Sequence, residues 1–310
     1  MAIIMWAALA VAGFWVALAA SRRVAKHATA LVKATNLSPF VVGVVVLAIG
    51  TDIPEIVNSI VTSAAGHGDL NVGDSIGSTL TQMTLVLGIL PFITRPMDIQ
   101  RRAVVAIGGL TALAVLAGVV LVGDGDLARL DGIILVAGWI AAIWAINRAD
   151  VWWSPPLPEA PGGRRIMHGL ATFGFLLIVA LGSVASVAAM IEIAEILVVP
   201  EYVISFFGAS IGTSLPELIV DITAIRAGAM ALAVGDILGS SLVDATLSIG
   251  IGPSLFPTAV DAETAVVGGL YTAVAIGMVT VLLSTTRRHG RLTGAALIAL
   301  YLLSYVVVLR

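Results

Sequence analysis

Two short segments place a glutamate directly after a helix-breaking proline inside a long apolar stretch. They read GTDIPE at residues 50–55 and GTSLPE at residues 212–217. Proline lacks a backbone N–H and disfavours helical geometry at the residue before it, so each helix should break there and free carbonyl oxygens. Carbonyls and a carboxylate in apolar surroundings are costly unless a donor or a cation satisfies them. The pattern therefore predicts cation binding at two broken helices.

Further oxygen donors accompany each glutamate at helical spacing. Thr51 precedes Glu55 by four residues, so a continuing helix would place both on one face. Polar pairs one turn apart follow later in each copy, namely Ser78 with Gln82 and Ser240 with Asp244. Such hard oxygen donors suit Ca²⁺ and Na⁺. The chain has no cysteine, which excludes disulfides, thiolate metal sites and thiol catalysis.

The two segments belong to a longer internal repeat. Shifting the chain by 162 residues aligns 41–91 with 203–253 without a gap, and 21 of the 51 paired positions are identical. The identities include the Pro and Glu of each motif and most of the later motifs GDSIGS and GDILGS. Apolar bias inflates matches of Leu and Val, but it does not produce paired Pro, Glu and Asp. The sequence therefore indicates a duplication.

The elements that carry these groups are expected to be membrane helices. The chain has 310 residues, of which 59% are hydrophobic and 11% charged, whereas soluble domains carry about 25% charged residues. Most of its ten apolar spans reach the roughly 20 residues that cross a bilayer. The spans cover roughly 2–20, 37–65, 70–93, 103–123, 127–147, 166–190, 197–225, 229–256, 262–284 and 292–309.

We expect an all-α polytopic membrane protein with ten transmembrane helices in an inverted 5+5 repeat, with helices 2, 3, 7 and 8 interrupted. The first five-helix repeat covers 1–146 and contains the motif region 41–91; the second covers 166–310 and contains 203–253. Residues 147–165, rich in Pro and Gly, form the linker. Five is an odd number, so the halves insert with opposite orientation. Inverted repeats are typical of secondary transporters, whose site lies at the midplane between them.

Basic residues are distributed unevenly between the two sides of the membrane. With the N-terminus outside, 14 of the 16 Lys and Arg fall in inside loops, and Arg129 and Arg310 fall outside. The positive-inside rule therefore predicts that both termini are outside and that the linker is cytoplasmic. We expect a multi-pass protein of the cell membrane. The net charge of −3 gives no indication of nucleic-acid binding.

The motifs GTDIPE…GDSIGS and GTSLPE…GDILGS resemble the two α-repeats of the cation/calcium exchanger superfamily, in particular its prokaryotic sodium/calcium exchanger branch. In both copies the Glu precedes the motif Ser by 23 residues and the last polar position by 27. The resemblance implies that Glu55 and Glu217 are the central Ca²⁺ ligands, shared with Na⁺. The other implied ligands are Ala48 and Ser210 through their carbonyls, Thr51 and Thr213 through carbonyls or hydroxyls, and Asp52, Ser78, Gln82, Ser214, Ser240 and Asp244.

The sequence departs from the family pattern at several positions. The family usually has Ser where this chain has Asp52, and Asn where it has Asp74 and Asp236. We interpret Asp74 and Asp236 as helix caps or as partners that support the ligands. Asp52 adds a carboxylate beside the glutamates, and like charges this close are not all ionised without cations.

Alternatives remain for some residues. Ser78 and Ser240 could simply allow close helix packing. Asp52 could point away from the site into a polar cavity. Asp221, whose counterpart in the first repeat is Ser59, could be a charge that faces a cavity or a ligand.

The resulting hypothesis is a secondary active antiporter, and not an enzyme, that exchanges Ca²⁺ for Na⁺ by alternating access at a shared midplane carboxylate site. Ca²⁺ and Na⁺ would be transported ions, with no prosthetic group, and the chain would function as a monomer in membrane lipid. The additional Asp residues favour one alternative, an antiporter of the same fold coupled to H⁺ or carrying another divalent cation.

An intramembrane protease would need GxGD, whose first Gly is absent from NVGD and AVGD. A channel usually places its pore on an oligomer axis, whereas these motifs converge within one chain.

Overall fold

The structure is a computed structural model that describes residues 2–33, 38–94, 96–149, 165–196, 200–286 and 288–310. Helices labelled α are α-helical and those labelled η are π-helical. The first half contains α1 (Ala2–Lys33), α2 (Pro39–Val41), η1 (Val42–Leu47), α3 (Ala48–Thr51), α4 (Ile53–Ala65), α5 (Gly68–Leu80), η2 (Thr81–Val86), α6 (Leu87–Ile93), α7 (Arg101–Ala103), η3 (Val104–Gly108), α8 (Gly109–Val122), β1 (Asp126–Leu127) and α9 (Arg129–Arg148). The second half contains α10 (Arg165–Ile196), α11 (Glu201–Val203), η4 (Ile204–Ala209), α12 (Ser210–Thr213), α13 (Leu215–Arg226), α14 (Met230–Val243), η5 (Asp244–Ser248), α15 (Ile249–Leu255), β2 (Thr258–Ala259), α16 (Ala262–Thr285) and α17 (Arg291–Val308).

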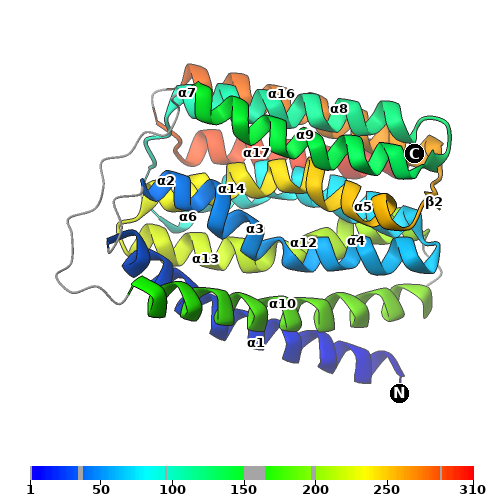
Figure 1. Cartoon of the computed structure of the whole chain (residues 1–310), viewed down its shortest axis with the longest axis horizontal. Coiled ribbons are helices and arrows are strands. Elements are labelled where there is room, and N and C mark those ends of the chain that lie inside the picture. Colours follow the sequence, from blue (N-terminus) through cyan, green and yellow to red (C-terminus); the bar gives the residue numbers. More distant parts are fainter. Residues whose placement is uncertain (1, 34–37, 95, 150–164, 197–199, 287) are drawn as a thin grey trace.

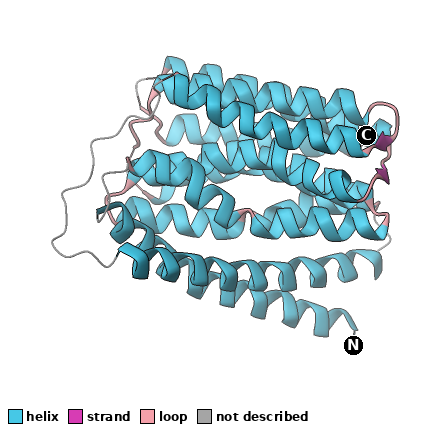
Figure 2. Ribbon diagram, viewed as in Figure 1, coloured by secondary structure: helices cyan, strands magenta, loops and turns pink. Residues whose placement is uncertain are grey.

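The described residues form a bundle of membrane-spanning helices. Nine helical spans are long and apolar enough to cross a membrane, and the bent pair Pro39–Thr51 and Ile53–Ala65 makes a tenth. The predicted all-α class with ten spans is therefore confirmed, and Figure 2 shows how little of the chain is not helical. The first helix is longer than the expected span 2–20, because α1 continues through the basic segment to Lys33. Most of the predicted linker, 150–164, lies outside the described residues.

The helices lie in three groups in Figure 1. The long helices α1 and α10 run beside each other along one side of the bundle, and α8, α9, α16 and α17 lie on the opposite side. The motif helices α3, α4, α5, α12, α13 and α14 lie between these groups. Both chain ends lie at the same end of the molecule (Figure 1), as an even number of spans requires. The interrupted helices of both repeats therefore form the middle of the bundle.

The interruptions in the four middle spans take two forms. The second and seventh spans are broken at one residue each, where α3 meets α4 and α12 meets α13. The third and eighth spans continue without a break but change from α-helix to π-helix, in η2 and η5. Single turns of π-helix occur frequently at functional sites. The same irregularities recur in both halves, as a duplication predicts.

Glycine allows the two repeats to approach closely. A Cβ added to Gly77 of α5 would lie 2.3 Å from the carbonyl oxygen of Phe206 in η4. One added to Gly239 of α14, the counterpart of Gly77, would lie 2.6 Å from the carbonyl oxygen of Val44 in η1. Each contact joins one repeat to the other, backbone against backbone, which no residue with a side chain allows. The glycines thus bring the adjacent serines of both motifs to the interface between the repeats.

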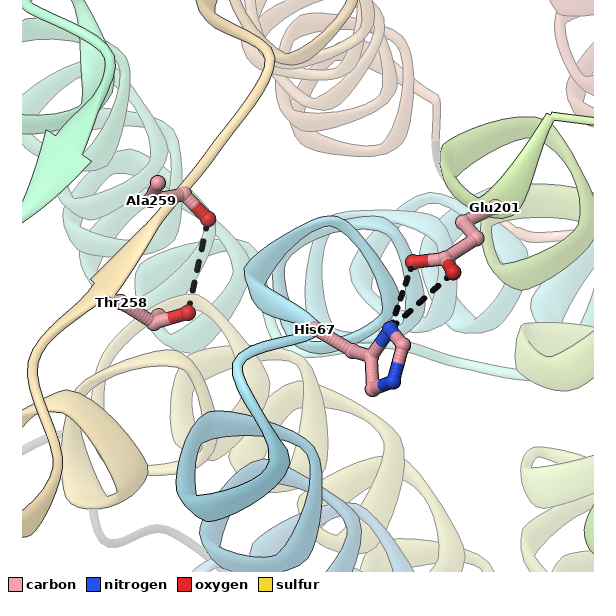
Figure 3. Close-up of polar contacts among 4 residues, drawn as sticks. All are labelled: His67, Glu201, Thr258 and Ala259. Atoms are coloured by element: carbon pink, nitrogen blue, oxygen red, sulfur yellow. Dashed lines mark hydrogen bonds and ion pairs between the residues drawn. The ribbon is translucent and has the colours of Figure 1, made fainter.

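Polar contacts join the repeats at the end of the molecule where the chain termini lie. Strands β1 and β2, one from each half, pair antiparallel, with Asp126 opposite Ala259. Nearby, the ring Nδ1 of His67 lies 3.0 Å from a carboxylate oxygen of Glu201 (Figure 3). Both side chains are about half exposed, so this ion pair adds little stability.

Candidate functional site

Both helices break beside the prolines, but one residue earlier than predicted. The residues before the prolines, Ile53 and Leu215, begin the next helix, and Pro54 and Pro216 lie in its first turn, where proline is tolerated. Asp52, with φ −83° and ψ 7°, separates α3 from α4, and the two parts of this span meet at an angle of 41°. Ser214, with φ −81° and ψ −1°, separates α12 from α13 in the same way. Glu55 and Glu217 consequently lie in the first turns of α4 and α13. The positive end of the helix dipole there favours a carboxylate.

The carbonyls that precede each break accept hydrogen bonds within their own helix. Thr51 Oγ1 lies 3.1 Å from the carbonyl oxygen of Leu47 and 3.3 Å from that of Ala48. Thr213 Oγ1 likewise lies 3.1 Å from the carbonyl oxygen of Ala209 and 3.3 Å from that of Ser210. The carbonyls of Ala48 and Ser210 also accept the N–H of the residue at the break. Their role as ion ligands therefore stays a prediction.

The polar residues of the two repeats meet around an approximate two-fold axis. Gln82 Nε2 donates to Asp244 Oδ2 over 3.0 Å, and these residues are 162 positions apart, which is the repeat offset. A residue that touches its own counterpart lies on the axis that relates the halves. The axis also relates two equivalent contacts to each other. The hydroxyl oxygens of Thr51 and Ser240 are 3.3 Å apart, and those of Thr213 and Ser78 are 3.1 Å apart.

Four buried carboxylates gather at this axis. Oxygens of Asp52, Glu55 and Asp244 all lie within 4.8 Å of one another. Glu217 interacts electrostatically with Glu55 and with Asp52. All four residues are at most 1% exposed. Asp52 therefore points into the group, and the alternative that it faces a separate polar cavity is not what the structure shows.

These carboxylates have almost no hydrogen-bond donors of their own. Both oxygens of Asp52, Glu55 and Glu217, and one oxygen of Asp244, receive no hydrogen bond from the described residues. No Lys or Arg in the described part of the chain forms an ion pair with any of them. A buried, uncompensated carboxylate is strongly unfavourable, so bound cations or protons must neutralise this group. Carboxylate, hydroxyl and amide oxygens are the donors that Ca²⁺ and Na⁺ prefer.

The remaining predicted ligands lie around this group. The Ser214 hydroxyl is buried and receives no hydrogen bond from the described residues. Ser210 Oγ donates to the carbonyl of Phe206 and lies 3.4 Å from Thr81 Oγ1. The structure thus places every predicted side chain near the interface of the repeats; which of them touch an ion stays a prediction.

Asp74 and Asp236 occupy the same position in the two repeats but have different neighbours. Asn58 Nδ2 donates to Asp74 Oδ2 over 2.8 Å, and Thr213 Oγ1 lies 3.3 Å from Asp74 Oδ1. Asp236 instead faces Asp221 of α13, and the Thr51 hydroxyl lies against it.

Sequence reasoning missed three polar neighbours. These are Asn58, Thr81 and Ser241, whose hydroxyl donates to Gln82 Oε1 over 3.1 Å. Ser241 adjoins the motif residue Ser240, and Asn58 follows Glu55 by one helical turn. The short distance along the sequence between these residues and the motifs could have indicated that they lie near the site.

A cavity of about 180 Å³ opens beside the site between α4 and α10. Pro54, Val57 and Val61 line it on one side, and Val184 and Ala188 on the other. Asn58, Thr62 and Thr213 contribute its polar lining. The cavity therefore connects the flank of α10 with the hydroxyl and amide groups around Asp74.

Comparison with known proteins gives the family. A profile of the sodium/calcium exchanger protein family matches residues 4–146 and again 168–310. The chain belongs to the sodium/calcium exchanger family. Members of this family are transporters, and their ions are cargo rather than prosthetic groups. The double match covers both halves, in agreement with the duplication.

Individual relatives of this sodium/calcium exchanger family member are distant. The inner membrane protein YrbG of Escherichia coli is 28% identical in an alignment 272 positions long that covers 82% of this chain and 81% of the relative. The sodium/calcium exchanger MaX1 of Methanosarcina acetivorans is 23% identical in an alignment 348 positions long, gaps included, that covers 91% of this chain and 92% of the relative. A solved structure of the sodium-calcium exchanger NCX_Mj, soaked with 2.5 mM Na⁺ and 10 mM Sr²⁺, superimposes with a TM-score of 0.75 at 23% identity, covering 98% of this chain and 99% of that one. This likeness confirms the fold.

Proposed function

We propose that this protein exchanges Ca²⁺ for Na⁺ across the cell membrane at one shared site between the two repeats. The observation that carries the proposal is the group of Asp52, Glu55 and Asp244, whose oxygens lie within 4.8 Å of one another beside buried Glu217. The name of the family and of its member MaX1 supports the identity of the two ions.

Ca²⁺ and Na⁺ would compete for the same carboxylates. Glu55 and Glu217 come from opposite repeats, so a divalent ion held by both would draw the repeats together. Several Na⁺ ions would neutralise the same group in its place. The empty group carries up to four negative charges in a buried position, which makes passage of the unloaded site through a closed state costly. Exchange is thereby favoured over leak.

Access would alternate between the two faces while the middle of the bundle stays packed. The proposed moving part is the pair α1 and α10, which lies beside the middle helices (Figure 1). The cavity between α4 and α10 would be the path to one face. We further propose that both termini lie outside the cell, that the 147–165 linker is cytoplasmic, and that one chain in membrane lipid suffices for transport.

A gradient experiment tests the exchange. Protein reconstituted into sealed vesicles loaded with Na⁺ should accumulate ⁴⁵Ca²⁺ when diluted into Na⁺-free buffer, and vesicles loaded with K⁺ at the same ionic strength should not. Accumulation that follows an imposed pH gradient and ignores the Na⁺ gradient would contradict the choice of Na⁺.

That second outcome defines the alternative function, a Ca²⁺ or other divalent-cation antiporter coupled to H⁺. One observation favours it. Asp52 gives the site a fourth carboxylate, and two charges remain after one Ca²⁺ is bound. Protons as well as Na⁺ ions neutralise such an excess. Competition of Sr²⁺ or Mn²⁺ with ⁴⁵Ca²⁺ in the same vesicles would define the divalent preference.

A further inference from the structure

Asp221 and Asp236 form a second group of buried carboxylates that the exchange mechanism above does not use. Asp221 lies on α13 and Asp236 on α14, and their carboxyl groups face each other. Both residues are 0% exposed. None of their four oxygens receives a hydrogen bond from a donor in the described part of the chain. Each is thus a fully buried acidic side chain that faces the other, and the Thr51 hydroxyl lies against Asp236.

The equivalent place in the first repeat is satisfied without a cation. The counterpart of Asp236 is Asp74, which accepts a hydrogen bond from Asn58. The counterpart of Asp221 is Ser59, whose Oγ accepts the backbone N–H of Gly252 over 3.0 Å. In the second repeat the position of Asn58 holds Val220, which offers no donor. The two repeats therefore share a fold but differ here: the first has a contact between an amide and a carboxylate, and the second has two carboxylates that face each other.

The pair lies one helical turn from the central site. Asp221 follows Glu217 by four residues on α13, a rise of about 6 Å. Asp236 precedes Ser240 by four residues on α14 and interacts electrostatically with Glu217 and Asp52. Asp221 lies between Glu217 and Arg226, the residue at which α13 ends. The pair is therefore contiguous with the central site and displaced toward that end of the bundle.

We propose that Asp221 and Asp236 form a second divalent-cation site, which Ca²⁺ occupies on its way between the central site and the Arg226 end of the bundle. Two carboxylates match the charge of one Ca²⁺, and four carboxylate oxygens with the Thr51 hydroxyl supply most of the oxygen ligands that this ion takes. The choice of Ca²⁺ rests on the function proposed above. The site is one-sided, because the first repeat has no equivalent of Asp221.

Equilibrium binding of ⁴⁵Ca²⁺ to the purified full-length protein in Na⁺-free detergent solution tests the site. Wild-type protein is expected to bind two ions. Asp221→Asn and Asp221→Ser, the latter restoring the residue of the first repeat, are expected to bind one. Ser59→Ala is the matched control in the other repeat and should still bind two. A single ion bound by wild-type protein, or two ions bound by the folded Asp221 variants, would overturn the proposal.

Transport from each face separates this site from the central one. Loss of the Asp221 charge should raise the half-saturating Ca²⁺ concentration about tenfold or more on the face nearer Arg226, and leave it unchanged on the other. Equal changes on both faces, or none, would contradict a one-sided site. The binding experiment uses no ion gradient, so failure of Na⁺ to drive uptake would refute the proposed exchange without affecting this result.

Discussion

Asp52 is a carboxylate of the central group whose counterpart, Ser214, is uncharged. It also lies at the break itself, so its backbone ends α3 while its side chain joins Glu55 and Asp244. Each repeat thus contributes two carboxylates, but from different positions: Asp52 and Glu55 from the first repeat, Glu217 and Asp244 from the second. In the proposed exchange, the total charge of the site sets how many monovalent ions are exchanged for each Ca²⁺.

The first prediction concerns this charge. Asp52→Ser removes one negative charge and gives the first repeat the Thr-Ser sequence of the second. We expect exchange to continue with one positive charge fewer moved per Ca²⁺, because a less negative site needs fewer counter-ions. The measurement is the reversal potential of ⁴⁵Ca²⁺ flux in vesicles under a K⁺-diffusion potential. An unchanged reversal potential would show that Asp52 binds no transported ion.

The second prediction concerns the two glutamates. Glu55→Gln and Glu217→Gln should each lower Ca²⁺ uptake at least a hundredfold, since removing one of two central charges weakens divalent binding by several kcal/mol. Both proteins should remain folded, because glutamine fits the same space without a buried charge. Uptake and thermal unfolding are measured on the same preparations. Uptake near the wild-type rate in either variant would refute the assignment of the central site.

The third prediction concerns His289, which lies between the spans α16 and α17. Its ring Nε2 lies 2.8 Å from the carbonyl of Leu87 and its Nδ1 lies 2.7 Å from Thr293 Oγ1. Burial lowers the pKa of His289 below the ordinary value of 6.5. The unfolded chain therefore binds this proton at a higher pH than the folded chain, and the folded state loses stability as pH falls below about 6.5.

We expect His289→Gln, which retains a donor and an acceptor, to reduce this loss. The Tm of both proteins is compared at pH 7.5 and 5.5. The wild-type Tm should fall further than that of the variant, although the variant starts lower because its contacts are less well placed. Parallel changes in Tm would show that His289 is as readily protonated in the folded protein as in the unfolded chain.

Individual helices differ in how far their sequence predicts them. The breaks at Asp52 and Ser214 were predictable to within one residue because the effect of proline is local. The π-helical turns that begin at Thr81 and Asp244 were not, since a π-turn changes the hydrogen-bond register by one residue and no residue type requires it. The contact of Asn58 with Asp74 also escaped prediction, because it depends on how α4 packs on α5. The repeat offset identified which residues correspond; the structure showed which residues meet and what surrounds them.

The fourth prediction concerns the contact between α1 and α10. A Cβ added to Gly182 would lie 2.6 Å from the carbonyl oxygen of Gly13, so the two backbones touch there. The Ser186 hydroxyl donates to the carbonyl of Ala10 over 2.8 Å nearby. Such close packing is what the proposed joint movement of these two helices requires.

Gly182→Val should therefore destabilise the protein by about 1–3 kcal/mol or more, through overpacking against a backbone that cannot yield. Gly174→Val is the matched control in the same helix, because a side chain there meets open space. The Tm in detergent and the uptake rate are measured for both. Equal effects of the two substitutions would mean that helix propensity, and not the contact with α1, determines the result.

The whole molecule has an orientation that the helix count alone leaves undetermined. Both chain ends lie at one end of the bundle (Figure 1), and the distribution of Lys and Arg predicts that this end faces outward.

The fifth prediction uses the absence of native cysteine. A cysteine introduced at Glu159 in the linker should resist a membrane-impermeant maleimide in intact cells and react after permeabilisation. A cysteine at exposed Pro257 should react in intact cells, and labelling of position 159 in intact cells would reverse the orientation.

The contact between Gln82 and Asp244 bears on how such a site could arise. In a pair of identical five-helix chains related by a two-fold axis, a residue on the axis meets a copy of itself, and every charge enters the site twice. An acid at that place would face an acid, and the total charge could only be even. Joining the two halves in one gene lets the axial residues differ, as an amide and a carboxylate do here. A fused chain can therefore hold a single carboxylate on the axis and an unmatched one, Asp52, beside it, an arrangement that two identical chains could not build.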